Sequence, residues 1–139
     1  MKVAGIHLEQ YPPARTQWST RNSGSIRSQI VVHTAEGGMT GTLNYLVDRT
    51  DAGSYHALVD FNHWKQTISY RHTAYHVRGH NTPTLGLSFA TWAAKWRDMN
   101  RGDRTAMMRQ GAEAANDMAN FLVSLGKPRP EPRLLTLAQ

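Results

Sequence analysis

The stretch QIVVHTAEGG, residues 29–38, decides how this chain is interpreted. Its β-branched run is typical of a buried strand, and the strand gives way to His33 and then to a loop with two glycines. Binding and catalytic groups are often found where a rigid element passes into a loop. His33 is therefore a candidate site residue, although a histidine that only packs in the core fits the local pattern equally well.

Strands and helices alternate along the chain after this stretch. We predict a strand over residues 28–33, then a helix capped by Thr40 that ends at residues 51–53. Residues 54–61 and 64–70 alternate like an antiparallel pair of strands, and residues 84–91 form another strand. Strands interleaved with helices predict an α/β fold, with a mixed central β-sheet flanked by helices.

The longest predicted helix begins near residue 103, with Asp103 or Thr105 as its cap, and Gly126 and Pro128 end it. Before it, Trp92 and Trp96 lie one helical turn apart and are expected to be packing anchors. The helix carries one apolar stripe, which we expect to face the core. The stripe consists of Met108, Ala115, Met118, Leu122 and Leu125.

Residues 1–27 and 71–84 contain prolines, glycines and small polar residues, so irregular structure is expected there. The length of 139 residues predicts a single domain over 1–139. Residues 134–137 resemble the start of a strand that the sequence does not complete. We therefore expect a domain that is truncated at its C-terminus and lacks its last strand.

The composition limits the classes of function. Hydrophobic residues make up 40% and charged residues 19%, which is typical of a folded domain. The net charge of +6 predicts attraction to polyanions such as nucleic acid, anionic cell walls or acidic membranes. Without cysteine there are neither disulfides nor thiolate metal ligands. No apolar run approaches the roughly 20 residues that span a bilayer, and the N-terminus is a poor signal peptide.

Histidines are the unusual feature: there are seven, and five lie between His56 and His80. Tyr55 and His56 are neighbours on a predicted strand, so their side chains should point to opposite faces. His72, His76 and His80 are spaced four apart. That spacing permits a zinc cluster, but Gly79 and the polar surroundings disfavour the helix that would best form it.

The order of four motifs resembles the type 2 N-acetylmuramoyl-L-alanine amidases, a family with short phage endolysins and animal peptidoglycan recognition proteins. The family has a strand ending in HxT, a SYHYxI strand, a WHAG…N segment and a strand with SIGIE. This chain has IVVHTAEG, GSYHALVD and TAYHVRGHNTPTLGLSF in the same order. The resemblance covers about residues 29–89 and extends through the long helix.

The resemblance implies a zinc enzyme that cuts the amide between the lactyl group of N-acetylmuramic acid and L-alanine. It makes His33 the first zinc ligand and Tyr55 the residue beside the zinc-bound water or the oxyanion. It places His76 and Asn81 in the substrate groove, next to Thr34 of the first motif, and gives His56 a structural role. Thr84-Leu85-Gly86-Leu87 matches SIGI, but Ser88 stands where the family has glutamate.

The family's chemistry needs a metal site that is incomplete in this sequence. Zinc lowers the pKa of bound water to about 7 and polarises the carbonyl, with three protein ligands and one open position. The family takes its other two ligands, a histidine and a cysteine or aspartate, from a strand after the long helix. Here no histidine follows His80 and there is no cysteine. We therefore expect weak zinc binding and little hydrolysis unless a partner chain completes the site.

The sequence is also compatible with two other functions. One is a peptidoglycan-binding module that has lost the metal; the other is a basic nucleic-acid-binding domain, suggested by HWKQTISYRH and TWAAKWRD. The amidase interpretation is favoured because it accounts for the ordered motifs. It implies bacterial peptidoglycan as the partner, with a further C-terminal wall-binding region in the parent protein. The expected location is the host cytoplasm until another protein opens the way to the wall.

Overall fold

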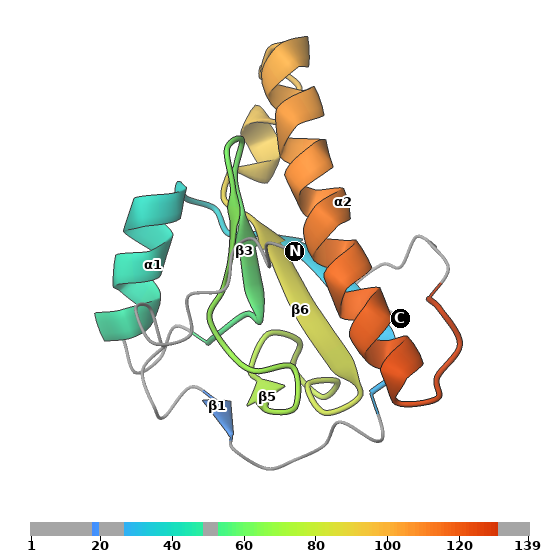
Figure 1. Cartoon of the computed structure of the whole chain (residues 1–139). Coiled ribbons are helices and arrows are strands. Elements are labelled where there is room, and N and C mark those ends of the chain that lie inside the picture. Colours follow the sequence, from blue (N-terminus) through green and yellow to red (C-terminus); the bar gives the residue numbers. More distant parts are fainter. Residues whose placement is uncertain (1–17, 20–26, 49–52, 131–139) are drawn as a thin grey trace.

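The computed structural model describes residues 18–19, 27–48 and 53–130, and its central element is a four-stranded sheet (Figure 1). The strand order is β2 (Gln29–Thr34), β6 (Thr84–Phe89), β3 (Ala57–Val59) and β4 (Trp64–Gln66). β6 is parallel to both β2 and β3, whereas β3 and β4 are antiparallel. The predicted mixed α/β fold is confirmed.

The two faces of the sheet are covered by different helices, α1 (Met39–Asp48) and α2 (Arg101–Ser124) (Figure 1). Side chains alternate along β6, so Leu85 and Leu87 pack with α2 while Gly86 and Ser88 face the other way. On the α1 side, three apolar residues of the helix pack with Leu58 and Ala90. The core therefore consists of two apolar clusters with the sheet between them.

A polar side chain caps the start of α2, and a glycine caps its end. The Asn100 side chain accepts a hydrogen bond from the Asp103 amide at 2.8 Å, so Asn100 is the cap and the predicted Asp103 or Thr105 cap is wrong. At the other end Gly126 has a φ of 81°, and the amides of Gly126 and Lys127 donate to Val123 and Leu122. The predicted end at Gly126 is confirmed, as a left-handed glycine cap.

The buried stripe of α2 differs from the prediction. Met108 is 53% exposed, whereas its neighbour Met107 is fully buried. Two predicted members are correct, Met118 and Leu122, but Ala115 and Leu125 are only half-buried. The reason is that a shift of one residue turns a helix by about 100°, and contact with the sheet, not local periodicity, decides which flank faces inward.

Several boundaries also differ from the predictions. Thr40 is inside α1 rather than its cap, since the helix begins at Met39. Residues 73–74, predicted to be irregular, form β5 (Thr73–Ala74), which pairs with β1 (Trp18–Ser19). The strand predicted over 54–61 is shorter, at Ala57–Val59. Residues 131–139, with the predicted strand start at 134–137, lie outside the described residues, as do most of residues 1–27 and residues 49–52.

The segment between β6 and α2 contains a short 3-10 turn, η3 (Ala93–Lys95), instead of a helical turn. Trp96 packs against Phe89, with ring centroids 6.1 Å apart, as an anchor should. Trp92 is 40% exposed, so its predicted anchoring role is wrong. Its ring instead contacts the Lys95 ammonium at 4.3 Å.

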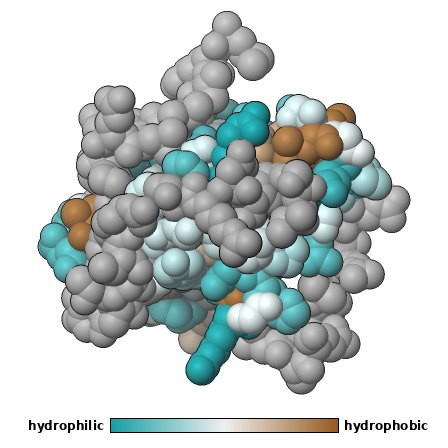
Figure 2. Space-filling model, turned by 90° about the horizontal axis from the view of Figure 1, so that it is seen from below, coloured by the Kyte–Doolittle hydropathy of each residue, from teal (hydrophilic) through white to brown (hydrophobic). Residues whose placement is uncertain are grey.

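Surface hydrophobicity is limited on the face shown in Figure 2, where brown gathers in small separate patches among the described residues. No helix in the described part of the chain is both long and apolar enough to cross a bilayer.

Gly111 of α2 lies directly against the Phe89 ring of β6, and replacing it by alanine tests this contact. An added Cβ would lie 2.5 Å from the Phe89 Cζ. Glycine-to-alanine changes inside helices usually stabilise by about 1 kcal/mol, but displacing a packed ring costs about 1–3 kcal/mol. We expect Gly111→Ala to lower the free energy of unfolding by about 1 kcal/mol in urea titrations. Gly102→Ala, in the same helix without such a contact, should not be destabilised.

Candidate functional site

His33 lies near the carboxyl end of β2, on the sheet face away from α2. It pairs in register with Ser88 of β6, and Val31 pairs with Gly86. Paired residues on adjacent strands share a face, so the imidazole lies on the same side as Gly86 and Ser88. This is the side covered by α1, and the ring is only half-buried.

His76 comes from the segment between β5 and β6 and meets His33 directly. His33 Nε2 and His76 Nδ1 are 2.9 Å apart, and the ring planes are nearly perpendicular, at 89°. The His76 ring rests on Gly86, where an added Cβ would be 2.7 Å from the ring's Cγ. The structure therefore brings together two of the histidines that the sequence singled out, and a glycine makes room for the second.

The hydrogen bonds around His76 determine which nitrogen carries its proton. The Thr84 hydroxyl donates to the His80 carbonyl at 2.6 Å, so it accepts from His76 Nε2–H at 2.9 Å. His76 Nδ1 is then an acceptor, and His33 Nε2–H is its donor. The pair is thus two neutral imidazoles with assigned tautomers.

Burial keeps both rings uncharged. Desolvation lowers the pKa of His33, and for His76 desolvation, reinforced by the adjacent His33, lowers the pKa to about 3. Both are therefore neutral at pH 7, the state in which an imidazole accepts hydrogen bonds or binds a metal.

Tyr55 and His56 do point in different directions, as alternation predicts. His56 is fully buried; its Nδ1 accepts from the Gly86 amide at 3.0 Å and its Nε2 donates to the His72 carbonyl at 2.9 Å. Desolvation lowers its pKa to about 3. His56 thus ties β6 to the segment that carries His76, which is a structural role.

Tyr55 faces the site. Its ring centroid lies 5.4 Å from that of His33. Burial raises the pKa of its hydroxyl, an effect that the neighbouring Ser88 hydroxyl partly offsets, so the phenol is protonated at neutral pH. Tyr55 is therefore a hydrogen-bond donor beside His33.

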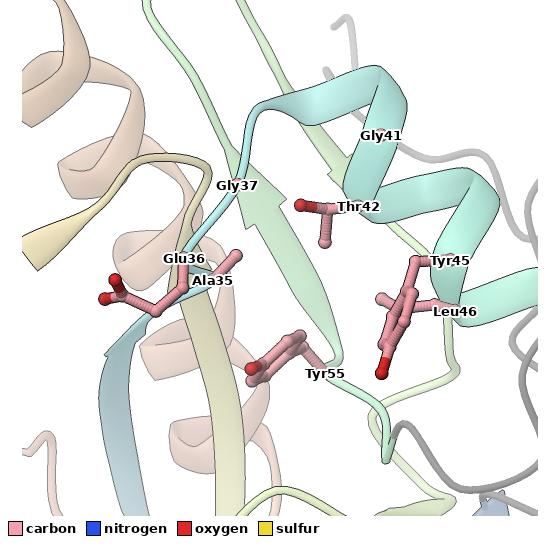
Figure 3. A pocket seen from close by; sticks show the side chains of 8 residues that line it. All are labelled: Ala35, Glu36, Gly37, Gly41, Thr42, Tyr45, Leu46 and Tyr55. Carbon is pink, nitrogen blue, oxygen red and sulfur yellow. The ribbon is translucent and has the colours of Figure 1, made fainter.

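A pocket of about 400 Å³ opens next to Tyr55, between the loop after β2 and helix α1 (Figure 3). Tyr55 and Tyr45 line it from different elements, and Glu36 lies at the loop. Tyr55 is the residue that this pocket shares with the surroundings of His33, whereas the two imidazoles themselves do not line it. The other lining residues are Ala35, Gly37, Gly41, Thr42 and Leu46.

The loop after β2 is held by Glu36, an exposed residue with a φ of 56°. Its carboxylate accepts hydrogen bonds from the Thr34 hydroxyl at 2.6 Å and from the Ala93 amide at 3.0 Å. These two bonds lower the pKa of Glu36. Thr34 therefore orders the rim of the pocket, and its predicted contact with substrate stays a prediction.

The Asn81 side chain stabilises the loop that carries His76. Its side-chain oxygen accepts from the amides of His76 and Val77 at 2.9 and 2.8 Å. This closes the loop that presents His76, and a substrate contact by Asn81 likewise stays a prediction.

The three histidines spaced four apart do not converge. The His72 ring stacks on Trp18, with centroids 5.3 Å apart, and His80 is exposed. In the described part of the chain, no three His, Asp or Glu side chains are grouped so that they could hold a metal. The suggested His72–His76–His80 zinc cluster is therefore wrong.

Solved structures with a similar fold include a hydrolase and an endolysin. The Staphylococcus aureus hydrolase AmiA, solved in complex with its ligand, has a TM-score of 0.62 at 17% identity; the match covers 91% of this chain and 58% of AmiA. PlyL gives 0.61 at 11% identity, with 92% and 77% covered. A mutant endolysin from Bacillus subtilis gives 0.59 at 12%, with 91% and 80% covered.

The chain has the fold of the type 2 amidases. At these identities the likeness concerns the fold alone, and the chain spans less than two thirds of the length of AmiA. No family model matches the sequence, and neither does any curated protein. Within the amidase fold, His33, Tyr55 and His76 come together on the face of the sheet that α1 covers.

The described residues do not complete a metal site. His33 is the ligand that the family resemblance implies, yet its Nε2 is engaged with His76, and no third ligand joins them among the residues described. A zinc site needs three protein ligands. The described residues alone therefore do not fit the metal.

Sequence reasoning missed three contributors to the site, namely Arg27, Thr84 and Gly86. Thr84 and Gly86 belong to the stretch that matches SIGI, but the resemblance assigned no individual role to either residue. Arg27 falls in a stretch predicted to be irregular, and no local pattern marks it. Its contacts are with carbonyls more than 40 residues away, so only the folded chain identifies it.

Proposed function

We propose that this chain is a peptidoglycan hydrolase that cleaves the amide between N-acetylmuramic acid and the L-alanine of the stem peptide. The observation that carries the proposal is the meeting of His33, Tyr55 and His76 on one face of the sheet in an amidase fold, beside a pocket. The likeness to the hydrolase AmiA and to an endolysin supports it.

The residues around His33 would have separate roles in binding and hydrolysis. The pocket beside Tyr55 would receive part of the wall fragment, with Thr34 and Asn81 at its approaches. Tyr55 is protonated at neutral pH, so its hydroxyl would donate to the oxyanion that develops on the amide carbonyl. His76, held by Thr84, would line the groove opposite.

Zinc dependence is part of the proposal, with His33 as the ligand on this chain. A bound zinc ion would polarise the carbonyl and activate water. Any further ligands would have to come from outside the described residues. Zinc content measured on the purified full chain tests this part of the proposal separately from the rest.

The second candidate is a module that binds peptidoglycan without cutting it. Two observations favour it: His33 Nε2 is committed to His76, and Ser88 stands where the family has an acid. Wall binding without zinc and without loss of turbidity would identify this function. Zinc at one equivalent together with lysis would identify the enzyme.

The His33→Ala variant tests whether His33 is needed for activity but not for folding. The half-exposed ring makes one inter-ring hydrogen bond, so we expect a loss in the free energy of unfolding of only about 1 kcal/mol. Lysis, followed as turbidity loss of purified walls and as new L-alanine amino groups, should fall at least about 100-fold. His63→Ala, on the turn between β3 and β4, is the matched control and should keep wild-type lysis. Full lysis by His33→Ala would rule out its role as ligand.

Tyr55→Phe separates catalysis from binding. The ring is retained, so wall binding measured by sedimentation should change less than twofold. Loss of an oxyanion donor should lower turnover about 100-fold. Equal losses in binding and turnover would support the binding module instead.

We also propose a partner and a location for this protein. The partner would be peptidoglycan, with a wall-binding region elsewhere in the parent protein, and the protein would stay in the host cytoplasm until it reached the wall. Nucleic acid is a weaker candidate, since Trp64 and Tyr70 are buried and Trp92 is left as the one exposed ring of the two basic stretches, which the structure describes in full. Binding to nucleic acid would weaken with salt by a log–log slope of about −0.7 to −0.9 per phosphate contact.

A further inference from the structure

Arg27, the residue two before β2, is fully buried, and its guanidinium makes an unusual set of contacts. All its hydrogen-bond partners among the described residues are neutral oxygens, and none is a carboxylate. They are the carbonyls of Tyr70, Arg71, His72, Asn81, Thr82 and Thr84, and the hydroxyl of Thr73. Burial lowers the pKa of Arg27 to about 10, so it stays charged at neutral pH.

These acceptors fall into two groups that lie at the two ends of one segment. Nε donates to Tyr70 at 2.8 Å, and Nη2 reaches residues 71–73. Nη1 donates to Thr82 at 2.6 Å and to Thr84 at 3.2 Å. Arg27 thus joins the beginning and the end of residues 70–84, the excursion that carries His76.

The two residues whose side chains hold His76 also accept hydrogen bonds from Arg27 with their backbone carbonyls. Asn81 accepts from the His76 amide with its side chain and from Arg27, at 3.4 Å, with its carbonyl. Thr84 bonds the His76 ring with its hydroxyl and Arg27 with its carbonyl. A continuous chain of hydrogen bonds therefore runs from Arg27 through Asn81 and Thr84 to His76, and from His76 to His33.

From this connection we propose that Arg27 is a positioning residue of the candidate site: it sets the His76 imidazole against His33 by fixing Asn81 and Thr84. The inference rests on the proposed function only for its kinetic consequence. The placement of the two rings is a property of the folded chain and is measured without substrate.

The chemistry of the side chain explains why arginine suits this position. A guanidinium presents five N–H groups in a planar fork, enough to serve acceptors on both sides. A lysine in its place keeps the charge and most of the stem but has three donors at one point, so it cannot serve both ends of the segment. The Arg27→Lys variant therefore removes the bridge while keeping the charge.

The test compares Arg27→Lys with Arg78→Lys, the same change at an exposed arginine of the same segment. Long-range ¹H–¹⁵N spectra report the tautomers of the His33 and His76 rings. For Arg27→Lys we expect the Nδ1 and Nε2 signals of His76 to move toward a mixture of tautomers, as the Thr84 bond loosens. The kcat for wall hydrolysis should fall about 10- to 100-fold with KM changed less than threefold. Arg78→Lys should leave both unchanged.

Two results would overturn the inference. One is an Arg27→Lys protein with wild-type ring signals, which would make Arg27 a residue of general stability only. The other is an equal disturbance in Arg78→Lys. If the lysine variant is too unstable alone, trimethylamine N-oxide favours its folded state during the measurement. Should the wild-type chain not hydrolyse walls, the proposed function fails, whereas the ring signals still decide the role of Arg27.

Discussion

Gly86→Ala is expected to lower the proposed wall lysis at least about 100-fold, although glycine has no side chain that could take part in the reaction. An alanine Cβ would lie 2.7 Å from Cγ and 2.8 Å from Nδ1 of His76, which are atoms near the root of the ring. Turning the ring about the Cβ–Cγ bond leaves Cγ in place, so relief of the clash requires another rotamer about Cα–Cβ or a shift of the whole residue. The bond from His33 Nε2 to His76 Nδ1 is then lost, and a displacement of about 1 Å at a reacting site costs about 100-fold in rate.

Stability should also fall in this variant. Overpacking of a buried position costs about 1–3 kcal/mol, which urea titration measures. Gly38→Ala is the control, because no atom lies within 4 Å of its added Cβ. Normal lysis by Gly86→Ala would mean that the His33–His76 contact is not needed for activity.

The second large effect is acid unfolding, which His76, with a pKa also lowered to about 3, shares with His56. The His56 ring is fully buried and neutral, with both nitrogens engaged, and desolvation lowers its pKa from 6.5 to about 3. In the unfolded chain the same ring takes up a proton below pH 6.5. The stabilisation from the neutral ring is therefore complete above pH 6.5 and is lost as the pH falls toward 3, by up to about 1.4 kcal/mol per pH unit.

A loss of this size approaches the whole stability of a small domain, about 5–15 kcal/mol, so we expect cooperative unfolding by circular dichroism between about pH 5 and 3. His56→Gln keeps an amide donor for the His72 carbonyl and removes the titrating group. It should be less stable at pH 7 but should lose less stability between pH 6 and 4. The same pH slope in both proteins would assign the acid lability to other groups.

The predictions from sequence were most accurate where local pattern and tertiary contact agree. The apolar strands at 28–33 and 84–91 and the glycine that ends α2 depend on nearby residues, and they are confirmed within a residue or two. The buried flank of α2 and the pairing of Trp18–Ser19 with Thr73–Ala74 depend on distant partners. These were predicted wrongly, because no local signal specifies them.

The candidate site shows the same division. The order of the motifs, through their resemblance to the type 2 amidases, indicated His33, Tyr55 and His76 as candidate site residues. The contact between His33 and His76 could not be foreseen, because it requires a space that Gly86 leaves open and a segment that Arg27 holds at both ends.

Taken alone, the order of residues determined the class of fold and indicated His33, Tyr55 and His76 as candidate site residues, since periodicity and motif order are visible in the sequence. Only the folded chain decided how the two imidazoles meet, which tautomers they adopt and that a buried arginine supports them. The physical reason is that hydrogen bonds between residues more than 40 positions apart form only when packing brings their partners within about 3 Å.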